Sequence, residues 1–432
     1  MTDAQPFDWG QWKTGELAPL EQHSEVKLNV LRDYIKRYID ILCRNTFGSR
    51  AFKLTLVDGF AGGGMYKDGK AGSPLVILKA VQEAEAHVNN FGARHNPIAI
   101  DAHFYFVEQD PTAFACLTHQ IEQSEFTDRI GKTVFLLQGE FQKHCTFIVA
   151  KTQERHRRGG QRVIFFLDQC GYTGVQPNLI RWLSEQLDHK AEFIINVAIR
   201  WLTHHLEDSI KCKSVISNMG LSDVLNLDEL LTIKNEKRVH WSYLIESKIG
   251  PAFWEKTGMP FFSPFYIEPE GSDRGYWLLH LAPHARARSA MADVHWDNAN
   301  GSIHYGHAGL NMLAYKADSD PTGYLEGMRF NDVTRQQSKQ LLHVDVARQI
   351  HDKFADGLSV KELLAVNSNG TIANEELFLE VVRDLVVDNE IVISGQTGGA
   401  KRSTTVSVED FVRPCRQLFL FGKKKQTQSR FN

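Results

Sequence analysis

Four acidic residues follow short apolar segments of the sequence, and carboxylates in such places can bind the amino and hydroxyl groups of a nucleoside. Asp58 and Glu108 end two of these segments, Glu140 comes soon after a third, and Asp168 ends a fourth. If the segments are parallel strands, their carboxyl ends lie at one edge of a sheet, where ligands bind in open α/β folds. Each signal is weak alone, but the four in order favour a site for a nucleoside-like cofactor.

The first acid leads into a loop that can hardly hold a side chain, because residues 57 to 64 read VDGFAGGG. Glycine lets the backbone approach a ligand closely. We expect Asp58 to meet the ammonium group of the cofactor or to order the loop, Glu108 to take both ribose hydroxyls, and Glu140 to read an adenine amino group. The predicted cofactor-binding residues are Asp58, Gly59, Phe60, Ala61, Gly62, Gly64, Glu108 and Glu140.

The fourth acid lies in the run FFLDQCGY, where it would face both the cofactor and an acceptor molecule. Asp168 is predicted to orient the acceptor. If that acceptor is a nucleic acid base flipped out of its double helix, Tyr172 is predicted to stack on it. Arg200 and Trp201, after the next apolar segment, are predicted to line the same mouth and bind substrate. Cys170 has no basic neighbour in sequence to activate its thiol, so we interpret it as a buried cysteine rather than a nucleophile.

An alternation of helices and strands must position these residues. Apolar residues at three- and four-residue spacing predict an amphipathic helix over residues 23 to 43. The predicted strands then cover residues 54 to 57, 103 to 107, 134 to 137, 163 to 167 and 193 to 197. The predicted helices between them cover residues 74 to 87, 112 to 122, 141 to 155 and 177 to 187. This order is typical of a doubly wound parallel sheet with right-handed crossovers.

Two further strands close this sheet in a different way. Residues 261 to 267 and 276 to 281 are separated by a loop too short for a crossover, so they must pair antiparallel. Five parallel strands followed by an antiparallel hairpin predict the mostly parallel, seven-stranded α/β sheet of class I methyltransferases. Residues 198 to 260 exceed what one connecting helix needs, and we expect a mostly helical insertion there.

The last part of the chain has a different pattern. Helices over residues 344 to 354, 359 to 366 and 374 to 389, and a hairpin of residues 391 to 394 and 404 to 408, predict a winged helix-turn-helix. Its third helix holds five acids against one arginine, so phosphates would be repelled from it. Contact with nucleic acid would then use Lys401, Arg402 and the basic tail; docking of a protein is an equal alternative.

Composition and charge set the wider limits. The 432 residues are 42% apolar, with a formal charge of −3, and suffice for several domains with real cores. We expect residues 1–45 to form an extension and helix, 46–297 the methyltransferase-like domain, 298–340 a connector, 341–422 the winged helix and 423–432 a basic tail.

Six scattered cysteines without a CxxC pair predict no metal site. The absence of a long apolar run or signal sequence predicts a cytoplasmic protein that does not enter membranes.

Several strings resemble one protein family. The runs VDGFAGGGMYKDGKAGSPL, FFLDQCG and GYWLLHLAPHARARSAMADVHW, together with the helix that carries Lys27, resemble the three-Cys-motif partner proteins of bacteria. The resemblance covers most of residues 20 to 300. It implies a class I methyltransferase-like fold, a radical-SAM-like partner with a three-cysteine motif, and a place in phage defence or on a mobile element.

Two departures from related patterns bear on activity. Asp58 and Glu108 are 108 − 58 = 50 positions apart, whereas roughly 20 is usual in a compact dinucleotide unit. Asp168 is followed by Gln169 where similar proteins tend to have proline.

Three hypotheses on function remain open at this point. The first is an S-adenosylmethionine-dependent methyltransferase that acts on a nucleic acid base or modified nucleoside without a metal. The second is a catalytically silent, methyltransferase-like scaffold that binds a protein partner or nucleic acid. The third, metal-dependent phosphodiester chemistry, is disfavoured because the sequence lacks a tight cluster of Asp, Glu and Lys.

Overall fold

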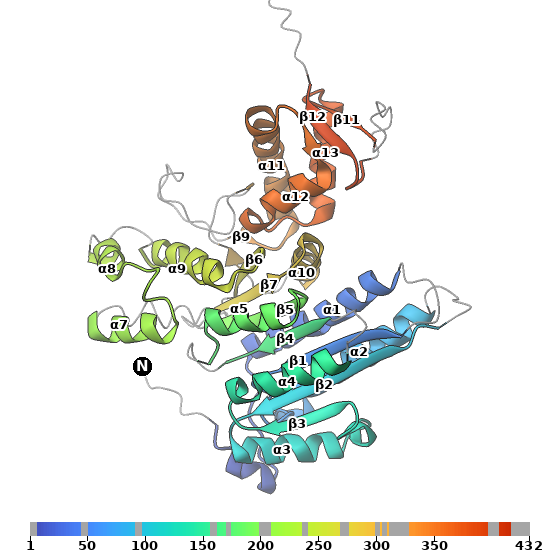
Figure 1. Cartoon of the computed structure of the whole chain (residues 1–432), viewed down its shortest axis with the longest axis vertical. Coiled ribbons are helices and arrows are strands. Elements are labelled where there is room, and N and C mark those ends of the chain that lie inside the picture. The colour runs from blue at the N-terminus through green and yellow to red at the C-terminus, as the bar shows by residue number, and fades with distance from the viewer. Residues whose placement is uncertain are drawn as a thin grey trace, which may run out of the picture.

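The computed structural model describes residues 7–44, 51–90, 97–155, 162–169, 174–197, 209–235, 241–267, 276–298, 303–304, 309–310, 328–395 and 406–415. A large α/β unit carries the central sheet, and a smaller unit formed by the last helices and strands adjoins it (Figure 1). Every structural statement below concerns these residues.

The central sheet has seven strands in the order β3-β2-β1-β4-β5-β7-β6. Its strands are β1 (Phe52–Asp58), β2 (Ile100–Glu108), β3 (Val134–Gln138), β4 (Val163–Leu167), β5 (Ala191–Val197), β6 (Phe261–Ile267) and β7 (Tyr276–Ala282). β1 to β5 pair in parallel, while β7 pairs antiparallel with both β5 and β6. The chain therefore has the doubly wound, mostly parallel sheet of class I methyltransferases, with all seven strands where the sequence predicts them.

Helices cover both faces of this sheet. The connecting helices are α1 (Gln22–Arg44), α2 (Ser73–Asn90), α3 (Pro111–Glu122), α4 (Phe141–Arg155) and α5 (Pro177–Gln186). Successive strand residues point to opposite faces: Leu56 joins the core under α1 and α2, and Val57 joins the core under α4 and α5. Burying one large apolar side chain of such a core stabilises the fold by roughly 1.5–3 kcal/mol.

The predicted insertion after β5 is helical where the structure describes it. It contains α7 (Ser209–Asn218), α8 (Leu227–Asn235) and α9 (Trp241–Thr257), and α9 packs on α5. A further helix, α10 (Ala285–Asn298), follows β7 and packs on α1. The sequence pattern does not predict α10 as a helix, because most of its apolar residues are alanines and they are mixed with Arg, His and Asp.

The smaller unit contains three helices and a three-stranded antiparallel sheet in the order β10-β12-β11. The elements are α11 (Asp332–Lys353), β10 (Leu358–Ser359), α12 (Val360–Asn367), α13 (Glu375–Val387), β11 (Ile391–Ser394) and β12 (Phe411–Pro414). Ser359 and Glu362 form a reciprocal capping box at the start of α12, and Asn374 caps α13 as its sequence suggests.

Two predicted boundaries in this unit are wrong. α11 starts at Asp332, inside the predicted connector, because Asn331 caps it by accepting a hydrogen bond from the Thr334 N–H. The described part of the second predicted hairpin strand, residues 406–408, is not a strand. The strand that pairs is β12, which follows a turn that Asp410 closes by accepting from the Ser407 N–H. Two-residue strands, β8 (Ile303–His304) and β9 (Met328–Arg329), pair between the units.

Candidate active site

Three of the four predicted acids converge at the carboxyl edge of the sheet. Asp58 ends β1, Glu108 ends β2, and Asp168 follows β4 directly. β1 and β4 are neighbours from which the strand order runs in opposite directions, so this edge is the topological switch point where α/β sheets bind ligands. The negative charges of Asp168 and Glu108 both act on Asp58, which shows how close the three groups lie.

The glycine loop is held over the strand ends by backbone hydrogen bonds. The Gly59 N–H donates to the Phe166 carbonyl at 3.0 Å, and the Ala61 N–H donates to the Val107 carbonyl at 2.9 Å. Gly64 has a φ of 78°, and a Cβ there would lie 2.8 Å from Leu117 Cδ1, so no other residue fits without strain. The loop is thus fixed on both neighbouring strands.

Asp58 lies beneath this loop rather than in front of it. Its side chain is fully buried, and Oδ1 accepts from the Phe60 N–H at 3.1 Å. Burial is the main cause that raises the pKa of Asp58 to about 7, with hydrogen bonds from Ser73 and Phe60 partly offsetting it. Of the two roles expected from the sequence, the structure favours ordering of the loop over contact with a cofactor.

Glu108 links the second strand to the same loop. Its Oε2 accepts from the Gly62 N–H at 2.7 Å, and its Oε1 accepts from the Asp110 N–H at 2.7 Å. Burial raises the pKa of Glu108, and backbone hydrogen bonds from Asp110, Gly62 and Gln109 oppose that effect. A carboxylate has about four acceptor positions, so acceptor capacity remains for hydroxyl groups of a ligand.

Asp168 is held by a lysine that reaches it from α1. Lys27 Nζ donates to Oδ1 at 2.8 Å and to Oδ2 at 2.6 Å, and Asn196 Nδ2 donates to Oδ1 at 2.7 Å. The Lys27 side chain is 6% exposed and that of Asp168 25%. Lys27 also lies over the Tyr276 ring, 5.3 Å from its centroid. Asp168 is therefore a positioned, ion-paired carboxylate with one open side.

No role for Lys27 or Asn196 follows from the sequence analysis. A usable signal for Lys27 does exist, since it lies on the buried stripe of α1 with Leu31 and Tyr34, which are 1% and 0% exposed. A charged residue on such a stripe is almost never buried unless it is paired. Asn196 gives no comparable signal, because polar residues near strand ends are common.

A short 3-10 helix covers the glycine loop. In η1 (Trp9–Thr14), the Trp9 ring lies so close to Gly63 that a Cβ there would be 2.1 Å from it. Trp12 of the same helix packs on His119 of α3, with ring centroids 5.4 Å apart. The cavity left between Trp9, the loop and Asp168 measures about 60 Å³, whereas ligand pockets usually measure about 300–1,000 Å³. The residue types fit an adenosyl cofactor, but a ligand of that size would fill this cavity only if η1 moved away from the glycine loop.

The remaining predicted site residues are not joined to this cluster in the described part of the chain. Glu140 is half-exposed and pairs with Lys143 at 2.8 Å, away from the cavity. Outside the described residues lie Tyr172, Arg200, Trp201, Lys401, Arg402 and Cys170. Their predicted roles stay predictions.

Neither a metal-binding cluster nor a membrane-spanning helix is found in the described ranges. They contain no group of three or more His, Cys, Asp or Glu side chains able to hold a metal ion. No helix among them has the length and apolar character needed to cross a membrane.

Comparisons with known proteins give only distant likenesses. No protein-family model matches the chain, and no curated protein matches it in sequence. A solved Legionella pneumophila protein of family DUF519 aligns at 10% identity over 59% of this chain and 85% of its own, with a TM-score of 0.29. A human methyltransferase 10 domain containing protein aligns at 10% over 59% and 83%, with a TM-score of 0.25. PKMT2 from Rickettsia typhi aligns at 11% over 83% and 74%, with a TM-score of 0.26.

Proposed function

We propose that the protein is an S-adenosylmethionine-dependent methyltransferase. The observation that carries this proposal is the convergence, at the switch point of the sheet, of a fixed glycine loop, a Glu108 carboxylate with open acceptor positions and an oriented Asp168. Glu108 would accept from ribose hydroxyls, and the loop backbone would approach the amino-acid part of the cofactor. The cofactor supplies an electrophilic methyl group when it is bound.

The acceptor that best suits Asp168 is an amino group. Lys27 and Asn196 hold the carboxylate, and its open side lines the cavity next to the glycine loop. That side can accept a hydrogen bond from an exocyclic N–H and so aim the nitrogen lone pair at the methyl donor. We therefore propose a nucleic acid base or modified nucleoside as substrate, with Tyr172 as a stacking group and Arg200 and Trp201 as further contacts.

The proposed partners follow from the family resemblance and the smaller unit. We propose a radical-SAM-like protein with a three-cysteine motif as partner, and a role in phage defence or on a mobile element. The element order of the smaller unit supports a winged helix. Two acids of α13, Glu380 and Asp384, form ion pairs with Arg335 and Lys339 of α11, so this side of α13 contacts α11. Nucleic acid would therefore contact the smaller unit through Lys401, Arg402 and the basic tail.

A second candidate function is a scaffold that no longer catalyses methyl transfer. It is favoured by the 60 Å³ cavity under Trp9, which is smaller than ligand pockets usually are. A scaffold would keep the sheet and the partner surface while the site stays closed.

Thermal unfolding with S-adenosylmethionine, followed by a transfer assay, separates the two candidates. A cofactor at 100 times its Kd should stabilise the wild type by about 2.7 kcal/mol. Glu108→Ala should remove this gain, whereas Glu122→Ala, an exposed acid at the end of α3, should keep it. Stabilisation together with labelled methyl transfer to nucleic acid supports the enzyme. The absence of both would leave the scaffold.

A further inference from the structure

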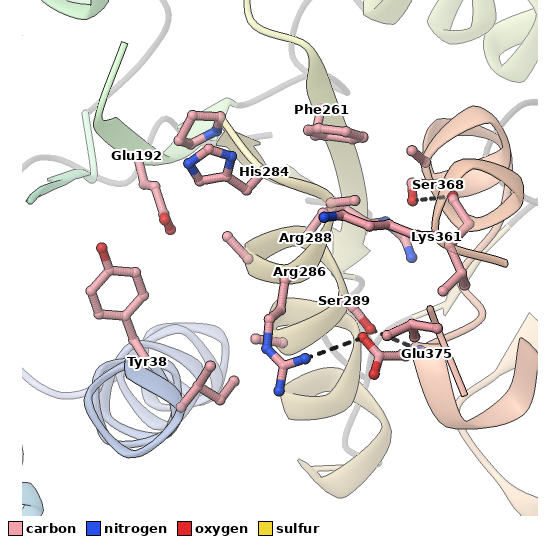
Figure 2. A pocket seen from close by; sticks show the side chains of 18 of the residues that line it. Tyr38, Glu192, Phe261, His284, Arg286, Arg288, Ser289, Lys361, Ser368 and Glu375 are labelled. Atoms are coloured by element: carbon pink, nitrogen blue, oxygen red, sulfur yellow. Dashed lines mark hydrogen bonds and ion pairs between the residues drawn. The ribbon is translucent and has the colours of Figure 1, made fainter. Parts of the chain in front are cut away.

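A second, larger cavity in the described part of the chain lies far from the glycine loop. It measures about 700 Å³ and opens between the second half of α1, the start of α10, and α12 and α13 of the smaller unit (Figure 2). Arg162 and Lys190, which precede β4 and β5, place it at the amino edge of the sheet. Its volume is that of a site for a small organic ligand.

The inner wall of this cavity carries a buried acceptor. Glu192 is 3% exposed, accepts a hydrogen bond from the Tyr34 hydroxyl, and lies 3.5 Å from His280 Nε2. Figure 2 shows Glu192 and Tyr38 directed into the space between α1 and α10. Burial and the nearby Glu192 raise the pKa of Tyr38 well above its ordinary value, so its hydroxyl is a neutral group beside that acid. A ligand that reaches this wall must bring a hydrogen-bond donor.

Three basic residues also line the cavity. Arg162 and Lys190 are adjacent, because the Val163 N–H donates to the Lys190 carbonyl, and Lys361 of α12 lines the cavity from the smaller unit. Among the described residues, none of the three forms an ion pair, although Arg162 lies over the Phe52 ring at 5.1 Å. One lining acid, the exposed Glu409, also has no basic partner among the described residues, and it offsets part of this positive charge.

The other charges of the cavity are already engaged. Arg288 donates to Ser263 Oγ and to two backbone carbonyls of the smaller unit. Arg286 pairs with Glu375 at 3.6 Å. Much of the remaining lining is apolar or aromatic, with Tyr38, Phe261 and Phe378 among its residues.

We propose that this cavity binds a nucleoside phosphate, with the base N–H groups on Glu192 and the phosphates on Arg162, Lys190 and Lys361. A flat body that carries both hydrogen-bond donors and an anionic group matches the acceptor, the aromatic residues and the cations that line this cavity. An acidic peptide fits less well, because its backbone would need several polar partners along a wall that is apolar. Bound there, the ligand would bridge the sheet and the smaller unit.

Titration calorimetry with nucleoside di- and triphosphates of each base tests this site on the full chain. One or more should bind, and the paired substitution Lys190→Glu with Lys361→Glu should weaken binding roughly tenfold or more, since two cations that would contact the phosphates become anions. Lys132→Glu, an exposed lysine before β3, should leave affinity unchanged. Glu108→Ala should also leave it unchanged, which separates this site from the proposed cofactor site.

Three results would overturn the proposal. The first is no binding of any nucleoside phosphate to the wild type. The second is equal weakening by Lys132→Glu and by the paired substitution. The third is binding of pyrophosphate alone with the same affinity as the nucleotide, since the base would then contribute nothing.

Discussion

Lys27 and Asp168, 141 positions apart in sequence, form a bidentate ion pair that joins the first helix to the end of the fourth strand. Breaking a buried pair by removing one partner costs roughly 3–5 kcal/mol, and less where one partner is partly exposed as Asp168 is. We expect Lys27→Met to lower the free energy of unfolding by roughly 2–4 kcal/mol in urea titrations. It should also abolish any methyl transfer, because Asp168 loses its orientation.

The same helix offers a matched control for this substitution. Lys36 pairs with Glu83 at 2.9 Å, but both side chains are at least 40% exposed. Exposed pairs contribute only about 0–1 kcal/mol, so Lys36→Met should change the stability little. Equal losses for the two substitutions would show that the Lys27 pair has no special role.

The contact of Trp9 with Gly63 predicts that η1 competes with the cofactor. If the closed form holds roughly 90% or more of the population, removing the ring should tighten binding of S-adenosylmethionine about tenfold. Calorimetry on Trp9→Ala measures this directly. Phe147→Ala, which removes an exposed ring on α4 (43% exposed), is the control. Weaker binding in Trp9→Ala would instead make Trp9 part of the cofactor site.

Asp58 predicts a specific dependence of stability on pH. Its pKa is raised from an ordinary value near 4 to about 7 in the folded protein, so between these values the folded state keeps a proton that the unfolded state has lost. The contribution of Asp58 to the free energy of unfolding is then fully present below about pH 4 and is lost as the pH rises towards 7. Asp58→Asn should remove this component, so that its stability relative to the wild type increases from pH 4.5 to pH 8.

Urea unfolding across that pH range measures the difference between the wild type and the variant. Asp68→Asn, an exposed position in the turn after the glycine loop, serves as the control and should follow the wild type. A constant difference between Asp58→Asn and the wild type at all pH values would contradict the prediction. It would mean that Asp58 ionises equally in both states.

The sheet is the part of this structure that the sequence predicts best. Each strand is a short apolar run, such as VIFFL in β4, whose burial on both faces follows from composition alone. The acids then converge because the topology brings strand ends together. This is why Asp58, Glu108 and Asp168 are found at one edge, while Glu140, one loop further out, pairs with Lys143 instead.

Features that depend on contacts distant in sequence could not be predicted in the same way. The position of Trp9 on Gly63 is set by packing of η1 on α3, and no local pattern specifies it. The large cavity needs α1, α10 and α12 to meet, which the sequence of any one of them does not indicate. The acids of the third helix predict repulsion of phosphates, but the sequence does not indicate that Arg335 and Lys339 of α11 pair with two of them, Glu380 and Asp384.

Arg288 should control how the smaller unit docks on the sheet. It is 1% exposed and donates to Ser263 Oγ at 3.0 Å, to the Ala373 carbonyl at 2.7 Å and to the Thr371 carbonyl. Arg288→Met would leave these acceptors without a charged donor, at about 1–3 kcal/mol for each one that stays buried. We expect calorimetry to resolve two unfolding transitions in the variant where the wild type shows one. Arg286→Met, with a side chain 61% exposed and an ion pair of 3.6 Å, should keep the single transition. A single, merely lowered transition in Arg288→Met would show that the two units unfold together without this contact.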